Sequence, residues 1–210
     1  MGYGVTPSWS RRLRPLPPQF SRPGDHGPGP LQPHEDRIPA DLAERQVPPP
    51  AILIAPIGRI SEAQYRQCLA ANLDSAFFIA KAYAPRMQKA ARPGAMLFFS
   101  SVAAGVGVAN HAAIAMAKGG LEGLVRSLAA DFSSAGLRAN AIAPGLMRTP
   151  ATERMLGNES AAKAIAGQYP LGRHGDADDA AALGAFLLSS DAGWINGQAV
   201  NLNGGGLMAV

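Results

Sequence analysis

Three side chains near the middle of the chain, Ser101, His111 and Lys118, are of types that could do acid–base chemistry. If the segment around Lys118 is helical, the residue four positions earlier shares its face, and that residue is Ile114. An isoleucine has no proton to give. His111 lies one turn before Ile114, and imidazole can move protons near neutral pH. Two interpretations of His111 stay open, acid–base work or satisfaction of the helix start, and the sequence favours the second.

Ser101 and Asn72 stand where special contacts are expected. The apolar run Ala95–Phe99 is typical of a strand buried on both faces, and Ser101 follows it. Open α/β sheets place ligand chemistry at the carboxyl ends of their strands, which favours a functional Ser101 and leaves Ser100 as the structural alternative. Asparagine is disfavoured in mid-helix, so Asn72 predicts a special hydrogen bond or a kink contact with a backbone carbonyl.

Residues 51–210 alternate between helical and strand-like segments. The first prediction is one helix or two over Ser61–Ala90, with a cap at Ser61 and with Pro85 inside. A strand over Ala95–Phe99, a helix over Asn110–Ser133 that ends at Gly136, and a strand over 137–145 are predicted to follow. After a loop-rich region to Pro170, we expect a helix within Asp176–Ser190 and a last strand within 197–206. This alternation indicates βαβ units, hence a parallel sheet in an α/β domain.

Residues 1–50 differ in composition from the rest of the chain. They hold 12 of the 18 prolines. Proline lacks an N–H and fixes φ, so this density excludes a regular helix or an interior strand over most of the segment. We expect residues 1–50 to be disordered or loosely attached, or to be read from a wrong start or frame, and residues 51–210 to form the domain.

Charge and composition exclude several classes of partner. The net charge is +4, but the basic residues are scattered apart from Arg11, Arg12 and Arg14, so no nucleic-acid partner is expected. No apolar run approaches the roughly 18 residues that span a membrane. Cys68 is the only cysteine, so no intrachain disulfide can form, which fits a reducing cytoplasm.

The segments of the domain carry motifs in a fixed order. The motifs are "ANLDSAFF" around Asn72, "LFFSS" ending at Ser101, "KGGLEGLVRSLAADF" headed by Lys118, "RANAIAPGLMRT" from Arg138 to Thr149, and "PLGRHGDADDAAALGAFLLSSDAGWINGQAVNLNGG". By their order and spacing, residues 51–206 resemble the C-terminal two thirds of a short-chain dehydrogenase/reductase. The resemblance implies a Rossmann-like parallel sheet with flanking helices, incomplete because the first strands are missing.

The resemblance implies hydride transfer between NAD or NADP and a small-molecule alcohol or carbonyl substrate. The family's serine binds the substrate oxygen, its lysine holds the nicotinamide ribose and its asparagine holds a water of the proton relay. These residues fall on Ser101, Lys118 and Asn72, and the proton-donating tyrosine falls on Ile114. Loss of a positioned general acid costs about 10²–10⁴ in rate, so impaired activity is expected unless His111 substitutes.

The stretch "PGLMRT" resembles the family's loop that meets the nicotinamide carboxamide through the backbone after Pro144 and Gly145 and through the Thr149 hydroxyl. Gly145 allows close backbone approach, although proline-glycine is also simply a turn. Thr149 has an alternative interpretation, as the cap of a helix that begins near Pro150.

The family's glycine-rich phosphate turn, TGxxxGxG, has no counterpart in this chain. Gly24, Gly27 and Gly29 come nearest, but the prolines among them remove the N–H donors that a phosphate cradle needs. Only the equivalents of the fifth, sixth and seventh strands are expected, which leaves "AMLFF" with an unpaired apolar edge. The run "AILIAPI" (residues 51–57) is a candidate to pair there, within the limit that Pro56 sets.

Two function classes follow from the resemblance. The first is an oxidoreductase that uses NAD or NADP with impaired activity. The alternative is a non-catalytic member or fragment that acts through homo-oligomerisation or a partner chain, because the family packs the helices equivalent to Ser61–Ala90 and Asn110–Ser133 across a subunit boundary. Neither the substrate nor the choice between NAD and NADP follows from the sequence.

Overall fold

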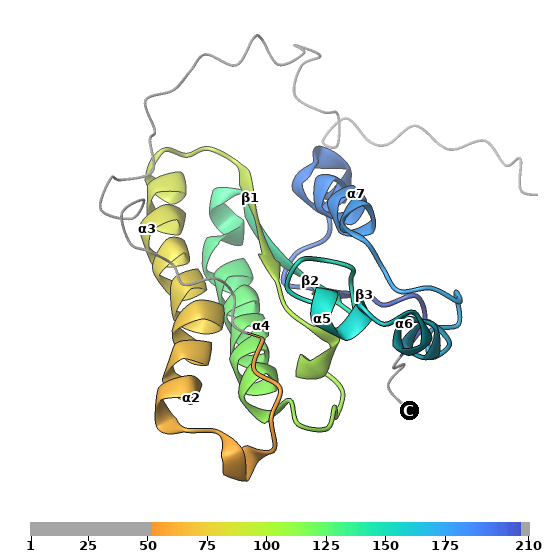
Figure 1. Cartoon of the computed structure of the whole chain (residues 1–210). Coiled ribbons are helices and arrows are strands. Elements are labelled where there is room, and N and C mark those ends of the chain that lie inside the picture. The colour runs from red at the N-terminus through yellow and green to blue at the C-terminus, as the bar shows by residue number, and fades with distance from the viewer. Residues whose placement is uncertain (1–51, 207–210) are drawn as a thin grey trace, which may run out of the picture. The chain divides into compact units, whose positions relative to one another are not determined.

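A sheet of three parallel strands lies at the centre of the computed structural model, which describes residues 52–206 (Figure 1). The strands are β1 (Gly94–Phe99), β2 (Leu137–Pro144) and β3 (Ala199–Leu202), in the order β1-β2-β3. The pairing of β1 with β2 begins at Gly94 and Leu137, and the pairing of β2 with β3 begins at Ala141 and Ala199. The predicted Rossmann-like α/β class is thereby confirmed, with only these strands in the described range.

The first helical segment is continuous and contains a widened turn. It runs through α2 (Glu62–Leu69), the π-turn η3 (Ala70–Asp74) and α3 (Ser75–Lys89). Ser61 is the predicted cap: its hydroxyl accepts the N–H of Gln64, and the Gln64 side chain accepts the N–H of Ser61. Pro85 stands inside α3 without ending it.

The remaining helices connect the strands. They are α4 (Ala112–Phe132), α5 (Glu153–Leu156), α6 (Glu159–Ala166) and α7 (Ala177–Leu188), with short 3₁₀ turns η2 (Ile57–Arg59), η4 (Val102–Ala104), η5 (Ser133–Ala135) and η6 (Ser190–Ala192). Gly136 ends the turn after α4 with φ of 78°, a left-handed conformation that glycine adopts without a Cβ penalty. The predicted stop at Gly136 is confirmed.

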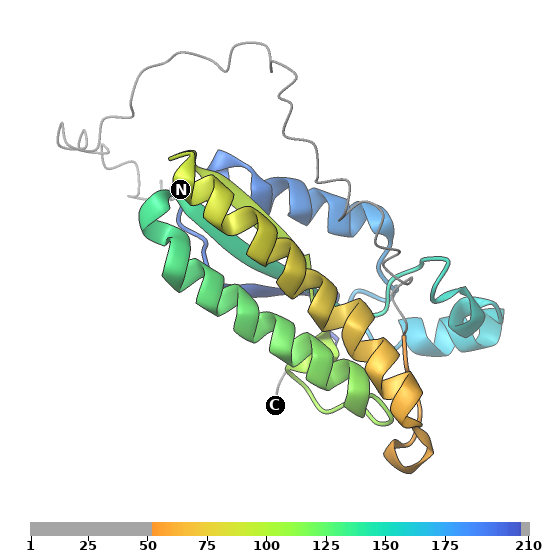
Figure 2. The same ribbon diagram turned by 90° about the vertical axis from the view of Figure 1, so that its left-hand side faces the viewer.

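The helices cover the sheet on both faces. Figure 2 shows α3 and α4 side by side over one face of the strands, with α7 on the opposite side. Alternation along the strands explains this layering, because successive side chains point to opposite faces. Phe98 and Ala139 belong to the core under α3 and α4, whereas Leu97 and Ile142 pack with Leu187 of α7.

Two polar side chains of β2 hold the segment that leads into β3. The Arg138 guanidinium donates to the carbonyl oxygens of Leu187, Ser189 and Ile195. Asn140 is 1% exposed, and its amide donates to the Ile195 carbonyl at 2.8 Å while its oxygen accepts the Gln198 N–H at 3.0 Å. Because buried polar groups need such partners, this segment depends on β2 for its position.

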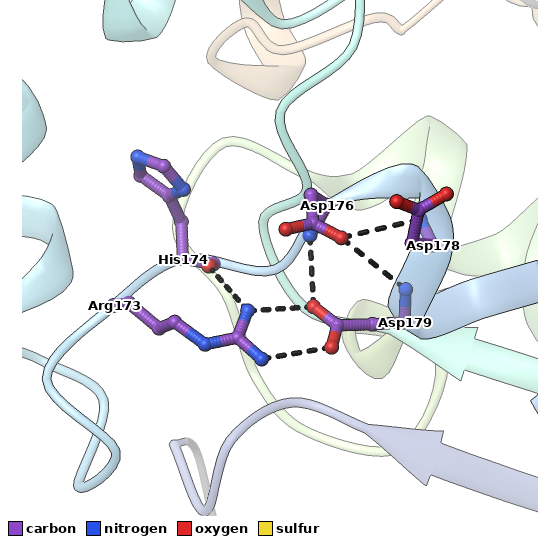
Figure 3. A network of polar contacts seen from close by, with 5 residues as sticks. All are labelled: Arg173, His174, Asp176, Asp178 and Asp179. Carbon is purple, nitrogen blue, oxygen red and sulfur yellow. Dashed lines mark hydrogen bonds and ion pairs between the residues drawn. The ribbon is translucent and has the colours of Figure 1, made fainter. Parts of the chain in front are cut away.

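The start of α7 is fixed by a network of acidic and basic side chains (Figure 3). The Asp176 carboxylate accepts the N–H groups of Asp178 and Asp179, which caps the helix. Arg173 donates to both oxygens of Asp179, at 2.6 and 2.8 Å. The Arg173 guanidinium, with the Asp176 N–H, holds the pKa of the Asp179 carboxyl well below its usual range. The ion pair therefore persists over the ordinary pH range.

The structure corrects the burial predicted for β1. Ala95–Phe99 was expected to be buried on both faces, but Phe98 alone of these residues is buried, and Phe99 is 50% exposed. The reason is topological: β1 pairs with β2 on one side, and no described strand covers its other edge. The unpaired apolar edge expected for this strand is thus present within residues 52–206.

One further expectation is wrong, one is refined, and one lies outside the structure. The region predicted as loop-rich before Pro170 also contains the short helices α5 and α6. The run expected to replace the missing strand forms none over its described residues 52–57, where the Ala55 N–H instead donates to the Asn110 carbonyl. The predictions for residues 1–50 concern a part that is not described. Within 52–206, no helix is both long and apolar enough to cross a membrane.

Candidate functional site

The carboxyl ends of all three strands meet at one edge of the sheet. Ser100 and Ser101 follow β1, Gly145 follows β2 and Asn203 follows β3. Parallel strands point the same way, so the residues after them lie at the same edge, which is where open α/β sheets bind ligands. Lys118 of α4 reaches this edge, since its Nζ donates to the carbonyl oxygen of Phe99 at 2.7 Å.

The two serines after β1 have different surroundings. Ser100 is 5% exposed, and its hydroxyl donates to Oε1 of Glu122 at 2.7 Å. Ser101 is partly exposed, and its Oγ accepts the N–H of Ala103 at 3.2 Å, which caps η4. Within the described range, no acceptor for the Ser101 hydroxyl proton is present. Ser100 is therefore tied into the fold, whereas Ser101 can still donate to a ligand.

Lys118 lies close to the buried Cys68 thiol. Burial lowers the pKa of the Lys118 amine from its ordinary value, and the interaction with Cys68 opposes this shift. Burial also raises the pKa of the Cys68 thiol, against the opposing effects of Asn72 and Lys118. The thiol is thus kept neutral. The amine of Lys118, which extends from α4 to the end of β1, is partly desolvated.

Asn72 lies in the π-turn between α2 and α3 and is 5% exposed. Its side-chain amide donates to the Cys68 carbonyl at 3.0 Å and contacts the Cys68 sulfur at 3.8 Å. The sequence left two alternatives for Asn72, a special hydrogen bond or a kink contact with a backbone carbonyl. The contact with the Cys68 carbonyl is of the second kind. π-turns are frequent at functional sites, and in this one the Asn72 amide contacts Cys68, whose thiol interacts with Lys118.

Ile114, four residues before Lys118, is a core residue with 6% exposure. It packs with Cys68 and Ala113, and the partly buried Leu53 and Tyr65 pack against the same cluster. An apolar cavity of about 450 Å³ adjoins this cluster and shares Tyr65 and Ala113 with it. The face of α4 before Lys118 is therefore hydrocarbon, as the sequence predicts.

His111 stands at the N-cap position of α4 and is partly buried. Its side chain does not cap the helix, and its Nδ1 lies 2.7 Å from the Ala109 carbonyl oxygen. The imidazole thus contacts the turn before the helix. Acid–base work by His111 at Lys118 remains a prediction, since no described contact joins these two side chains.

The turn after β2 is fixed by close contacts with Gly145. Pro144 ends β2, and a Cβ on Gly145 would lie 3.1 Å from the Tyr169 ring and 3.2 Å from the Asn203 Cβ. The Tyr169 hydroxyl accepts the Leu146 N–H at 2.8 Å. Glycine is needed here because the backbone passes against these side chains.

Thr149 does not cap a helix near Pro150, because the next helix, α5, begins at Glu153 after a turn. The Thr149 N–H donates to Oγ1 of Thr152 at 3.0 Å, and the two hydroxyl oxygens lie 3.1 Å apart. Thr152 is buried and also donates to the Met147 carbonyl. The hydroxyl pair holds this loop, and Thr149 itself is partly exposed at its surface.

Two residues that organise the site were not predicted. Glu122 could have been found from its spacing, because it lies four residues after Lys118 and thus one turn along the same helix face. No comparable signal points to Tyr169, whose hydroxyl accepts the N–H of Leu146, 23 residues earlier in the sequence. In the described part of the chain, no cluster of three metal-ligating side chains is present.

Comparison with known proteins shows the family. A family model described as enoyl-(acyl carrier protein) reductase matches residues 47–206. The 3-oxoacyl-(acyl-carrier-protein) reductase FabG of Pseudomonas aeruginosa is 36% identical over 151 residues, which are 72% of this chain and 60% of the relative. The chain spans about three fifths of the length of the curated relatives that it matches.

Solved structures with the same fold include nicotinamide-dependent enzymes. A 4-hydroxyisoleucine dehydrogenase mutant complexed with NADH and succinate matches with a TM-score of 0.73 and 25% identity, over 78% of this chain and 67% of the other. A putative 2-deoxy-D-gluconate 3-dehydrogenase from Agrobacterium tumefaciens with bound NADP matches with a TM-score of 0.71 and 30% identity, over 76% of this chain and 65% of the other. The chain belongs to the short-chain dehydrogenase/reductase family of NAD(P)-dependent oxidoreductases.

Proposed function

We propose that this chain binds the nicotinamide end of NAD or NADP beside Lys118 and transfers hydride to or from a small alcohol or carbonyl substrate at a reduced rate. The observation that carries the proposal is that a partly desolvated lysine and a serine, whose hydroxyl proton has no acceptor in the described part of the chain, both lie at the carboxyl end of β1. The reduced rate follows from Ile114, whose side chain cannot donate a proton.

The residues present fit the nicotinamide end of such a cofactor. The Lys118 amine binds a single neutral carbonyl, so it can exchange this contact for ribose hydroxyls. The turn after Gly145 presents backbone beside a cavity of about 70 Å³ that is also lined by Asn203. The pyrophosphate end differs, because residues 52–206 contain no glycine-rich TGxxxGxG turn.

Each residue has a defined task in the proposed reaction. When bound, the nicotinamide supplies or accepts the hydride. Lys118 would hold the ribose, and the backbone after Pro144 and Gly145 with the Thr149 hydroxyl would hold the carboxamide. Ser101 donates its hydroxyl proton in a hydrogen bond to the substrate oxygen. Asn72 supports the helix turn behind Lys118, and the proton itself must come from water or from His111.

Titration with NADH and NADPH tests the proposal. We expect saturable nucleotide fluorescence changes with the full chain. Replacing Lys118 by methionine should weaken binding about tenfold, because hydrogen bonds to charged groups are worth about 1.5–3 kcal/mol. The matched control is Lys81→Met on the exposed surface of α3, which should bind like the parent chain. Equal affinities for the parent chain and the Lys118 variant would contradict the assignment.

An exposed apolar surface favours a second candidate, a non-catalytic member that acts through homo-oligomerisation. Phe77, Phe78 and Ile79 of α3 are 49%, 45% and 47% exposed, and the two phenyl rings pack edge to face. Contiguous exposed apolar side chains commonly mark protein–protein contacts. The unpaired edge of β1 is a second place where another chain could bind.

Light scattering coupled to size exclusion tests this candidate. The parent chain should elute as an oligomer, and a Phe77→Arg, Phe78→Arg double variant should dissociate, because two buried charges at an interface cost several kcal/mol. The control is Phe186→Arg on α7, whose side chain is similarly exposed at 43% on the other side of the sheet. A stable, folded monomer of the parent chain would argue against association.

A further inference from the structure

Lys118 is a partly buried amine with no counter-ion among residues 52–206. Its described polar contact is with the neutral Phe99 carbonyl, and it takes part in no ion pair within residues 52–206. The natural partner would be Glu122, one helical turn further along α4. Glu122 is instead held by the Ser100 hydroxyl at 2.7 Å, so no described carboxylate stabilises the charged form of Lys118.

The surroundings of the amine favour its neutral, nucleophilic form. Ile114 lies on the same helix face one turn earlier, where hydrocarbon cannot stabilise an ammonium ion. Burial lowers the pKa of Lys118 accordingly. A lysine that is desolvated in this way is the type that attacks carbonyl carbons to form Schiff bases.

A proton donor lies near the same strand end. Ser101 stands two residues after Phe99, whose carbonyl oxygen accepts from Lys118, and the Ser101 hydroxyl has no acceptor within the described residues. Amine and hydroxyl therefore lie at the same edge of the sheet.

We propose that Lys118 reversibly captures small aldehydes and ketones as an imine. The nitrogen lone pair adds to the carbonyl carbon, and the carbonyl oxygen takes up a proton to give a carbinolamine. The C–O bond then breaks as the C=N bond forms, and the oxygen leaves as water with the two hydrogens of the amine. No electrons are gained or lost overall, so the reaction needs no nicotinamide and goes beyond the proposed hydride transfer.

Reductive trapping on the full chain without nucleotide tests this proposal. The chain is incubated with benzaldehyde and sodium cyanoborohydride at neutral pH, and each benzylated lysine is located by peptide mass spectrometry. The sequence has three other lysines, Lys81, Lys89 and Lys163, all exposed. We expect Lys118 to be modified about tenfold faster than any of them, as activated lysines are. Modification of the exposed lysines first, with Lys118 last, would overturn the proposal.

Two variants separate imine formation from an effect of folding. Lys118→Arg keeps a donor for the Phe99 carbonyl but cannot form an imine, so the fast modification should disappear while circular dichroism stays unchanged. Lys81→Arg should keep the fast modification. If the fast phase survives in the Lys118 variant, another group carries it and the proposal is wrong.

Nucleotide addition distinguishes the two proposals. Fast labelling of Lys118 that NADH does not slow supports imine formation and contradicts the proposed cofactor contact. Slow labelling of Lys118, combined with saturable NADH binding that depends on Lys118, contradicts imine formation and supports the cofactor contact.

Discussion

Replacing Ile114 by tyrosine is expected to raise carbonyl reduction by this chain about 10²–10⁴-fold, the usual contribution of a positioned general acid. The phenol would stand one helical turn before Lys118, on the same face of α4. In its protonated form the Lys118 amine would stabilise the phenolate that proton transfer leaves. The gain depends on nucleotide binding, and it is measured as the loss of NADPH absorbance with a panel of small ketones.

The control for this experiment is Ile114→Phe. Ile114 is buried against Cys68 and Leu53, so either ring overfills the site and should lower the free energy of unfolding by about 1–3 kcal/mol. The two variants differ only in the hydroxyl group. Activity that appears in the tyrosine variant but not in the phenylalanine variant therefore measures the contribution of the phenol as a proton donor. Equal, low rates for both variants despite saturable NADPH binding would show that the substrate carbon does not lie beside Lys118 and Ser101.

Replacing Asn140 by leucine is expected to lower the free energy of unfolding by about 1–3 kcal/mol, because it removes two hydrogen bonds made by a buried side chain. The Gln198 N–H loses its side-chain acceptor, and the Ile195 carbonyl keeps only its hydrogen bond from Arg138. The segment before β3 would lose contacts on the face of the sheet that packs against α7. Urea unfolding followed by circular dichroism measures the change.

Asn201→Leu is the matched control for this measurement. Asn201 lies on the neighbouring strand β3 with an exposed side chain, so the same substitution should change the free energy of unfolding by less than about 0.5 kcal/mol. Similar losses for both variants would show that strand propensity, rather than the two hydrogen bonds, determines the effect.

Local patterns predicted most of the fold. The Ser61 cap, the Gly136 stop and the helix after Asp176 each depend on residues within one turn, and each is present. The burial of β1 could not be predicted, because an apolar run looks the same in a central strand and at an edge. The bounds of short helices such as α5 could not be predicted within the loop-rich region, because four residues give too little periodicity to recognise.

The candidate site could be located from the sequence but not described in detail. The spacing of Ile114 and Lys118 correctly predicted an apolar face beside the amine. The contacts of that amine with Phe99 and Cys68 join α4 to β1 and to α2, and such contacts leave no trace in local patterns. Asn72 gave a partial signal: its residue type predicted a special hydrogen bond or a kink contact, although not the π geometry of the turn around it.

The parallel order of the strands has a consequence for the folding rate. No two neighbouring strands are joined by a short turn, since α4 lies between β1 and β2, and α5 to α7 lie between β2 and β3. Long loops must therefore close before the strand pairs form their contacts, which makes formation of the sheet slow relative to formation of its helices. During that interval apolar strands stay unpaired, so the yield of folded chain depends on how fast the helices dock.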